Sequence, residues 1–412
     1  MKTNPTLPLH KMNFLRRRRV SEDEDEDDIQ EAPISTTKKS RKPPNTAFRQ
    51  QRLKAWQPIL TPKSVIPLLF LIALIFAPLG IAILLTTYNV QLMTVDYSKC
   101  HELTAQKFEK VPSKYTSYHF KHKNTNPDFQ WRLFNSTDSS PQTCVVRFTL
   151  PKNLDPPIYL YYKLTNFFQN HRKYVESYDL EQLKGIAVSE GSLTDNCKPL
   201  MHSGEGDDRK IIYPCGLIAN SLFNDTFSNP VLLNAQNGDD NQTYVMSSKD
   251  ISWSSDRKHK FKKTKYDPKD IVPPPNWQAM FPEGYNDTNI PDLSEWEHFQ
   301  NWMRTAGLTS FYKLYGKNVT EPLTSGTYEI SIGMNYPVTI FGGTKSVVIT
   351  TNSIFGGRNL ALGLIYVIVA VISLVLGIGF LLQHFFKPRR IGDHNYLRNS
   401  ENGGNPNFRD QL

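Results

Sequence analysis

Two long apolar segments, one near each end of the chain, dominate its hydrophobic pattern. They cover residues 65–85 and 360–382, and neither contains Asp, Glu, Lys, Arg or His. At 1.5 Å per residue, each is long enough to cross a hydrocarbon core of roughly 30 Å. The pattern therefore predicts a two-pass membrane protein. Two buried core helices are the alternative interpretation.

Shorter apolar stretches that alternate with polar residues lie between these segments. The clearest of them are residues 144–150, 158–164, 327–334 and 346–351. Period-two alternation bounded by turn-forming residues predicts antiparallel strands. A helical pattern is clearest in residues 294–305, where Ser294 is the expected N-cap and Glu297 completes a capping box. Residues 88–358 are thus expected to form one large β-sandwich-like domain with helical insertions.

The charges that flank the apolar segments predict an orientation. Residues 1–64 contain 14 Lys and Arg against 8 Asp and Glu, and residues 383–412 contain 5 against 3. Because basic residues collect at the cytosolic ends of membrane helices, both termini are predicted to be cytosolic. The net charge of +9 then reflects topology and not nucleic-acid binding. The first 60 residues are polar, so the first span is expected to act as an uncleaved signal anchor.

All the cysteines lie between the two spans, and this agrees with a lumenal or extracellular middle segment. They are Cys100, Cys144, Cys197 and Cys215. An even number of cysteines outside the cytosol predicts two disulfides, and four unpaired thiols are the alternative. The sequence leaves three pairings open. We favour Cys100–Cys144 and Cys197–Cys215, because these pairs close the shorter loops.

Five acceptor sequences for N-glycosylation lie in the same middle segment. Their asparagines are Asn135, Asn224, Asn241, Asn286 and Asn318. Glycosylation of Asn-X-Ser/Thr takes place on the non-cytosolic side of the membrane, so these sequences support the same topology. We expect most of them, but not all, to be occupied.

The segments outside the middle domain divide into two tails, two spans and a juxtamembrane collar. Residues 1–46 contain a basic run and an acidic run with few aromatics, a composition typical of a disordered cytosolic tail. The collar is residues 47–64, followed by the first span at 65–87. The second span is expected at 359–382 and the second cytosolic tail at 383–412.

The first part of the collar has helix-forming composition and ends at a proline. Phe48 and Trp56 are apolar anchors among the basic residues Arg49, Arg52 and Lys54. A basic, partly amphipathic segment next to a span is expected to lie on the anionic membrane surface or against a cytosolic partner.

Small residues one helical turn apart occur in both spans. Ala73 and Ala77 form one such pair, and Ser373 and Gly377 form the other. Small residues at this spacing allow helices to approach closely, so we interpret these four as contacts to a partner, with chance spacing as the alternative. Since Ser373 is the most polar interior residue, the spans carry no groups that would mark a transport path.

Motifs for catalysis are incomplete in this sequence. Gly-Thr-Lys-Ser at residues 343–346 resembles the end of a phosphate loop but lacks the earlier glycine that such loops require. His119 and His122 would point to opposite faces of an extended segment, which favours surface histidines over metal ligands. Cysteines committed to disulfides disfavour a zinc site or a cysteine nucleophile. We therefore expect no catalytic residue, no metal and no cofactor.

Several blocks of sequence together resemble one known family. They are residues 42–58, 167–175, 213–227, 273–277, 301–306 and 335–357. In this order and on this topology they resemble the accessory (beta) subunits of phospholipid-flippase P-type ATPases, the cell-division-cycle-fifty / ligand-effect-modulator-three family. The collar is similar to that of fungal Golgi and endosomal members. The likeness covers roughly residues 40–395.

The resemblance implies a non-catalytic subunit with an obligate partner. That partner would be a type IV P-type ATPase, which moves phosphatidylserine or phosphatidylethanolamine to the cytosolic leaflet. This chain would be needed for the folding of the partner, its exit from the endoplasmic reticulum and its full activity. The resemblance also implies a β-rich lumenal domain with disulfides between neighbouring cysteines, and residence in trans-Golgi and endosomal membranes, with the endoplasmic reticulum and plasma membrane as further locations.

Two other classes of protein share the two-pass topology. A trimeric ion-channel subunit with a disulfide-linked ectodomain would need polar pore-facing positions and typically more ectodomain cysteines than the four present. A lumenal hydrolase on a two-pass anchor would need a nucleophile or a metal site. The uncharged spans, the four cysteines and the incomplete catalytic motifs disfavour both classes.

Overall fold

A computed structural model describes residues 45–53, 60–103, 107–121, 127–134, 142–233 and 241–388. The described residues fall into two units of the chain, which divide between Ile59 and Leu60. Four of the residues singled out above, Lys54, Trp56, His122 and Asn135, lie outside the described residues.

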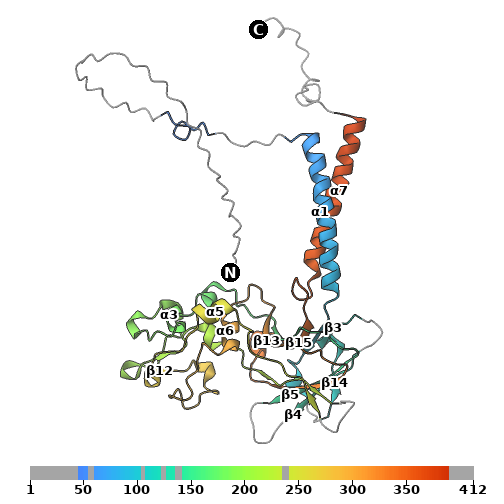
Figure 1. The fold of residues 1–412 in the computed structure, drawn as a ribbon. Coiled ribbons are helices and arrows are strands. Elements are labelled where there is room, and N and C mark those ends of the chain that lie inside the picture. The colour runs from blue at the N-terminus through green and yellow to red at the C-terminus, as the bar shows by residue number, and fades with distance from the viewer. Residues whose placement is uncertain are drawn as a thin grey trace, which may run out of the picture. The chain divides into compact units, whose positions relative to one another are not determined.

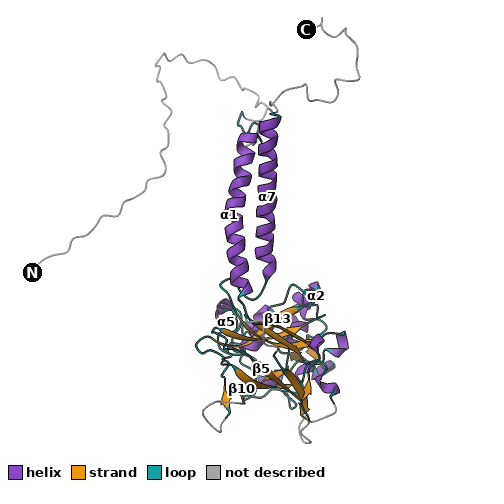
Figure 2. Cartoon of the chain, turned by 90° about the vertical axis from the view of Figure 1, so that its right-hand side faces the viewer, coloured by secondary structure: helices purple, strands orange, loops and turns teal. Residues whose placement is uncertain are grey.

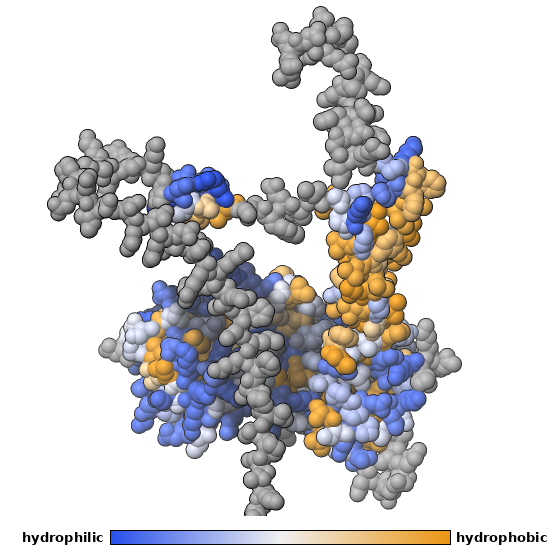
Figure 3. All heavy atoms as spheres, turned by 45° about the horizontal axis from the view of Figure 1, so that its top comes forward, coloured by the Kyte–Doolittle hydropathy of each residue, from blue (hydrophilic) through white to orange (hydrophobic). Residues whose placement is uncertain are grey.

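Two long helices of 27 residues each, α1 (Pro62–Tyr88) and α7 (Leu360–Phe386), run side by side (Figure 1). Both are long and apolar enough to cross a membrane, and their outer surfaces are apolar (Figure 3). α1 includes the first predicted span, 65–87, and extends beyond both of its ends, whereas α7 begins one residue after the predicted start at 359 and continues four residues past 382. The side chain of Asn359 caps α7 by accepting a hydrogen bond of 3.0 Å from the amide of Ala361.

The described strands form three sheets. The first sheet has the order β13 (Phe311–Asn318), β6 (Ile158–Leu164), β15 (Lys345–Thr351), β1 (Leu92–Asp96), β3 (Thr116–His119). The second has the order β11 (Gln242–Thr243), β10 (Val231–Leu232), β14 (Gly326–Gly333), β5 (Thr143–Leu150), β4 (Phe129–Phe134), β2 (Glu109–Lys110), and β9 (Thr226–Phe227) also pairs with β14. The third is β12 (Ile271–Val272), β8 (Lys210–Ile212) and β7 (His202–Ser203). Every pairing in the two large sheets is antiparallel, as expected for the domain.

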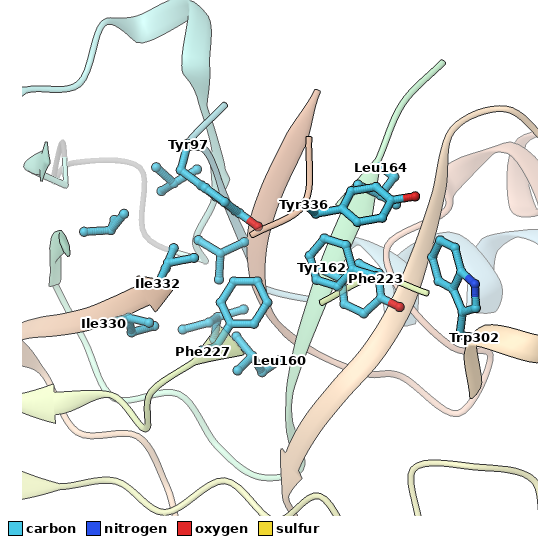
Figure 4. Close-up of a cluster of buried hydrophobic side chains, with 14 of the residues drawn as sticks. Tyr97, Leu160, Tyr162, Leu164, Phe223, Phe227, Trp302, Ile330, Ile332 and Tyr336 are labelled. Atoms are coloured by element: carbon cyan, nitrogen blue, oxygen red, sulfur yellow. The ribbon is translucent and has the colours of Figure 1, made fainter. Parts of the chain in front are cut away.

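The two large sheets lie in layers that enclose the core (Figure 2). In β6 the side chains alternate between buried and half-buried, which places Leu160 and Tyr162 in the core. Ile330 and Ile332 of β14 reach the same cluster from the second sheet (Figure 4). The four strands expected from period-two alternation are all present, and the β-sandwich-like arrangement is confirmed.

Five short α-helices accompany the sheets in the described part of the chain. They are α2 (Arg172–Val175), α3 (Leu180–Leu183), α4 (Leu217–Asn220), α5 (Ser254–His259) and α6 (Glu297–Met303). The capping box predicted for α6 is wrong, because its N-cap is Trp296 and no side chain caps it. Ser294 instead donates to Asp292, and the Glu297 carboxylate accepts from the amides of Asp250 and Ser252.

The helix predicted for the collar is also not formed in its described part. Residues 47–51 form turns, in which the amide of Arg52 donates to the carbonyl of Ala47. Gln51 has a φ of 54°, in the left-handed region that interrupts a right-handed helix. Local turn geometry therefore overrides helix propensity in this stretch.

The long helices continue from adjacent strands of the first sheet. Only residues 89–91 separate α1 from β1, and β15 leads through residues 352–359 into α7. β1 and β15 are hydrogen-bonded neighbours, with Leu92 opposite Thr350. The imidazole of His119 lies 2.9 Å from the Tyr88 carbonyl oxygen, which joins β3 to the end of α1. The helix pair is thus tied directly to the centre of the sheet.

Candidate functional site

The interface between α1 and α7 is built from small residues. Ala73 of α1 and Ser373 and Gly377 of α7 are buried, and Ala77 is half-buried. The contacts that bury them include those between the two helices of this chain. Small residues at these positions allow α1 and α7 to approach each other closely. Contact with a partner is therefore not needed to explain why these residues are small.

Two glycines that the sequence interpretation missed make the closest approaches. A Cβ atom on Gly80 would lie 2.9 Å from Cγ2 of Val367, and one on Gly363 would lie 2.8 Å from Cγ of Leu84. A seven-residue repeat of small residues in the sequence could have identified these two glycines. Ala73, Gly80 and Thr87 of α1 are seven residues apart and buried, as are Gly363, Ala370 and Gly377 of α7. A seven-residue period keeps one stripe of each helix facing the other.

The buried carboxylate of Asp225 links the first sheet to the segment between β14 and β15. Its Oδ2 accepts a hydrogen bond of 2.8 Å from the Tyr97 hydroxyl and lies 2.8 Å from Nζ of Lys345. Its Oδ1 accepts from the amides of Asn335 and Tyr336, each at 2.6 Å. We call these five residues the Asp225 network. Since both carboxylate oxygens are paired, the cost of burying the charge is offset locally.

Burial in the protein interior shifts the pKa values of two side chains in the Asp225 network. Burial lowers the pKa of Lys345, and the Asp225 carboxylate opposes that shift. Burial and then the Asp225 charge raise the pKa of the Tyr97 phenol well above its ordinary value. A lysine and a carboxylate held in this way form a structural ion pair. Lys345 belongs to the Gly-Thr-Lys-Ser sequence, so its Nζ is engaged in the core and not in a phosphate loop.

Lys313 of β13 is a second buried lysine, and it satisfies main-chain carbonyls near the end of α6. Its Nζ donates to the carbonyl oxygen of Asn301 at 2.8 Å and to that of Arg304. Burial, with the nearby Arg304 charge, lowers the pKa of Lys313 to about 7. Carbonyls left over at a helix C-terminus favour a cation, which accounts for the position of this ammonium group.

Two buried tryptophans bind the main chain of α4 from different segments. The indole of Trp277 donates to the carbonyl of Ala219 at 2.8 Å, and that of Trp302 donates to the carbonyl of Ile218 at 2.9 Å. Gly216, with a φ of 96°, precedes α4 in a conformation that favours glycine. Most of the sequence blocks that carry the family resemblance therefore meet in one core, next to the Asp225 network (Figure 4).

The four cysteines form two disulfides with the pairing favoured above. Cys100 with Cys144 joins the segment after β1 to β5, so it links the first sheet to the second. Cys197 with Cys215 lies in a separate small cluster that includes Leu193. The Cys100–Cys144 bond therefore connects two sheets, whereas the Cys197–Cys215 bond lies beside the paired strands β7 and β8.

The collar residues that the structure describes are exposed. The Phe48 side chain is 77% exposed, and Arg49 and Arg52 are also exposed. The guanidinium of Arg52 donates to the side chain of Asn45. Among the described residues of the chain there is no group of three or more His, Cys, Asp or Glu that could hold a metal ion.

The chain is similar to known proteins over most of its length. The model of the LEM3 (ligand-effect modulator 3) family / CDC50 family matches residues 83–390. The phospholipid-transporting ATPase accessory subunit CRF1 of Saccharomyces cerevisiae is 51% identical over 369 residues, which are 89% of this chain and 91% of that protein. The accessory subunit CDC50 of Chaetomium thermophilum is 43% identical over 86% of this chain and 90% of its own length. Cell cycle control protein 50A of Bos taurus is 36% identical over 85% and 91%.

Proposed function

The chain belongs to the LEM3 / CDC50 family, and from this premise we propose that it is the non-catalytic accessory subunit of a phospholipid-transporting P-type ATPase. The observation that carries the proposal is similarity, over nearly the whole length, to proteins that are named for this role. ATP hydrolysis and lipid movement then belong to a type IV P-type ATPase partner. This chain contributes a folded domain and two membrane helices.

The proposed orientation has both termini in the cytosol and the β-rich domain in the lumen or outside the cell. Basic residues before α1 and after α7 support it. The two disulfides of the domain support it as well, because they persist in oxidising compartments. Trans-Golgi and endosomal membranes are the proposed main location, and the endoplasmic reticulum and plasma membrane are proposed as further locations.

Three surfaces are proposed to bind the ATPase: the domain, the outer faces of α1 and α7, and the collar. Since the small residues of the helices face each other, the exposed Leu and Ile side chains face outward. A rigid domain tied to both helices would hold the extracytosolic loops of the partner in place. By mass action, a subunit that binds only the folded ATPase stabilises it, which supports a role in folding and in exit from the endoplasmic reticulum.

Affinity purification of the full chain in mild detergent tests this proposal. A large multi-span ATPase is expected to co-purify in equal amount, and its steady-state level is expected to fall when this chain is removed. If only this chain is recovered, and the levels of all P-type ATPases stay unchanged without it, the proposed role is wrong.

Charge reversal in the collar is expected to weaken the complex. The variant changes Arg49, Arg52 and Lys54 to Glu. An exposed ion pair with a partner contributes about 0.2–1 kcal/mol and reversal adds repulsion, so the three changes together should lower recovery of the partner by about tenfold. The same reversal at Arg16, Arg17 and Arg18 in the predicted tail is the matched control. If co-purification and lipid transport are intact in the collar variant, the collar is not a contact surface.

The exposure of each asparagine side chain supports a proposed order of occupancy for the glycosylation sites. Asn241 and Asn286 are exposed. Nδ2 of Asn318 donates to the carbonyl of Val245, and Oδ1 of Asn224 is buried beside the Asp225 network. We expect glycans on Asn241 and Asn286 and none on Asn224, because the attached sugar needs an accessible amide.

Peptide mapping after enzymatic deglycosylation measures this occupancy site by site. Asn241→Gln and Asn286→Gln should each increase electrophoretic mobility by one glycan, and Asn224→Gln should leave it unchanged. A glycan on Asn224 would contradict the ranking. A protein without glycans at any of the five sites would contradict the proposed orientation.

A further inference from the structure

A cavity of about 400 Å³ lies where the first sheet meets the start of α7. One side is the outer face of the first sheet, which contributes Tyr161 and Tyr312. The other side is the segment between β15 and α7, which contributes Asn352, Phe355 and Arg358. This volume is within the range of small-molecule sites, and the lining combines aromatic, apolar and cationic groups.

The helix lengths place this cavity at the depth of the lipid headgroups. Each 27-residue helix is about 40 Å long at 1.5 Å per residue, close to the roughly 40–45 Å of a bilayer with its headgroup regions. Arg358 precedes the first residue of α7, Leu360, by two positions. Its guanidinium therefore belongs to the headgroup layer on the side of the β-rich domain.

Aromatic side chains on the outer face of the first sheet fit this depth. The ring of Tyr161 lies 6.1 Å from that of Tyr159 and 6.5 Å from that of Tyr312. Nζ of Lys163 lies 5.5 Å from the centre of the Tyr312 ring. Tyrosine collects at the membrane–water interface, because its ring is apolar and its hydroxyl is polar.

Two polar groups of the cavity lining, the Arg358 guanidinium and Oδ1 of Asn352, lack partners among the described residues. Arg358 makes no hydrogen bond or ion pair with any residue in the described part of the chain. Oδ1 of Asn352 is buried and likewise accepts no hydrogen bond from the described residues. A cation left unpaired next to an aromatic, partly apolar hollow is suited to an amphipathic anion.

The neighbouring side chains distinguish a lipid from a soluble anion. Ile354 is 95% exposed and Phe355 is 52% exposed, in the segment that leads into the membrane helix. Exposed apolar side chains at this depth are stable when they contact acyl chains. A free phosphate would leave these apolar surfaces in water.

We propose that the cavity binds one phospholipid from the leaflet on the side of the domain. The phosphate pairs with Arg358, the headgroup lies against Tyr161 and Tyr312, and the acyl chains follow the outer face of α7. The site requires only that α1 and α7 cross a bilayer, so it can be tested in this chain without the proposed ATPase.

Photo-crosslinking of the full-length chain in phosphatidylcholine nanodiscs tests the site. The probe is a phosphatidylcholine with a photoreactive group near the glycerol, and crosslinked peptides are mapped by mass spectrometry. We expect labelling of residues 352–359, normalised to labelling of the outer face of α7. Arg358→Ala should reduce it about tenfold, and Arg358→Lys should retain an intermediate yield. Lys387→Ala, which removes an exposed cation at the other end of α7, should leave it unchanged.

Three results would overturn the proposal. Labelling of residues 352–359 that is unchanged in Arg358→Ala would mean that the phosphate is not recognised. Equal labelling by a diacylglycerol with the same photoreactive group would mean that apolar contact alone holds the lipid. Displacement of the probe by millimolar inorganic phosphate would mean that the cavity is a soluble-anion site. Because Arg358 is exposed and unpaired within the described residues, its replacement does not remove a folding contact.

Discussion

Replacing Asp225 with Ala is expected to destabilise the β-rich domain by about 3–5 kcal/mol. The substitution leaves the Lys345 ammonium buried without its carboxylate, at an original distance of 2.8 Å. It also leaves the Tyr97 hydroxyl and the amides of Asn335 and Tyr336 without their acceptor. Since whole domains are stable by about 5–15 kcal/mol, this single change removes a large part of the total.

Thermal unfolding of the purified chain measures this loss. A fall in Tm of roughly 6–15 °C is expected for a domain of this size. In a double-mutant cycle with Lys345→Met, the combined loss should be smaller than the sum of the single losses, because the double variant has no unpaired buried charge. Arg172→Ala is the control, since its ion pair with Glu176 is exposed and contributes little. If Asp225→Ala shifts Tm no more than this control, the Asp225 network does not stabilise the domain.

Removing the disulfide between Cys100 and Cys144 is expected to have an effect of similar size. This bond closes a separation of 44 residues, against 18 for Cys197 and Cys215. On the loop-entropy account, the longer loop contributes about 4 kcal/mol and the shorter about 3 kcal/mol. The bond also links the two large sheets, so its loss allows the layers to separate.

Two paired variants compare these bonds without leaving a free thiol. Cys100→Ser with Cys144→Ser should lower Tm more than Cys197→Ser with Cys215→Ser does, in identical detergent. A smaller shift for the Cys100–Cys144 pair would show that the link between the sheets is less important than the loop-length argument requires.

Much of the fold is predictable from periodicity. The spans follow from the uncharged apolar segments, and β5, β6, β14 and β15 follow from alternating residues, because both signals are local. The N-terminus of α6 and the turn in the collar could not be predicted in this way. At α6, tertiary contacts of the Glu297 side chain with the main chain replace the capping box, whereas in the collar local turn geometry overrides helix propensity.

The Asp225 network was missed because its members are far apart in the sequence. Asp225 is the middle residue of a glycosylation sequence, and Lys345 is part of an apparent phosphate loop. Neither local pattern indicates a buried ion pair across 120 residues. The seven-residue spacing of Ala73 with Gly80, and of Gly363 with Ala370, is present in the sequence but falls outside the four-residue pattern of small residues.

We propose that this chain supports a lipid-transporting ATPase and performs no transport itself. Its buried lysines are engaged with a carboxylate or with carbonyls, and its helices pack through small apolar residues. These features stabilise the fold and the helix pair.

Reconstitution in liposomes tests this claim most directly. The measurement is ATP-dependent translocation of a fluorescent phospholipid by this chain alone, by the co-purifying ATPase alone, and by the complex. We expect lipid translocation by the complex, little or none by the ATPase alone, and none by this chain alone. Lipid translocation or ATP hydrolysis by the isolated chain would contradict it.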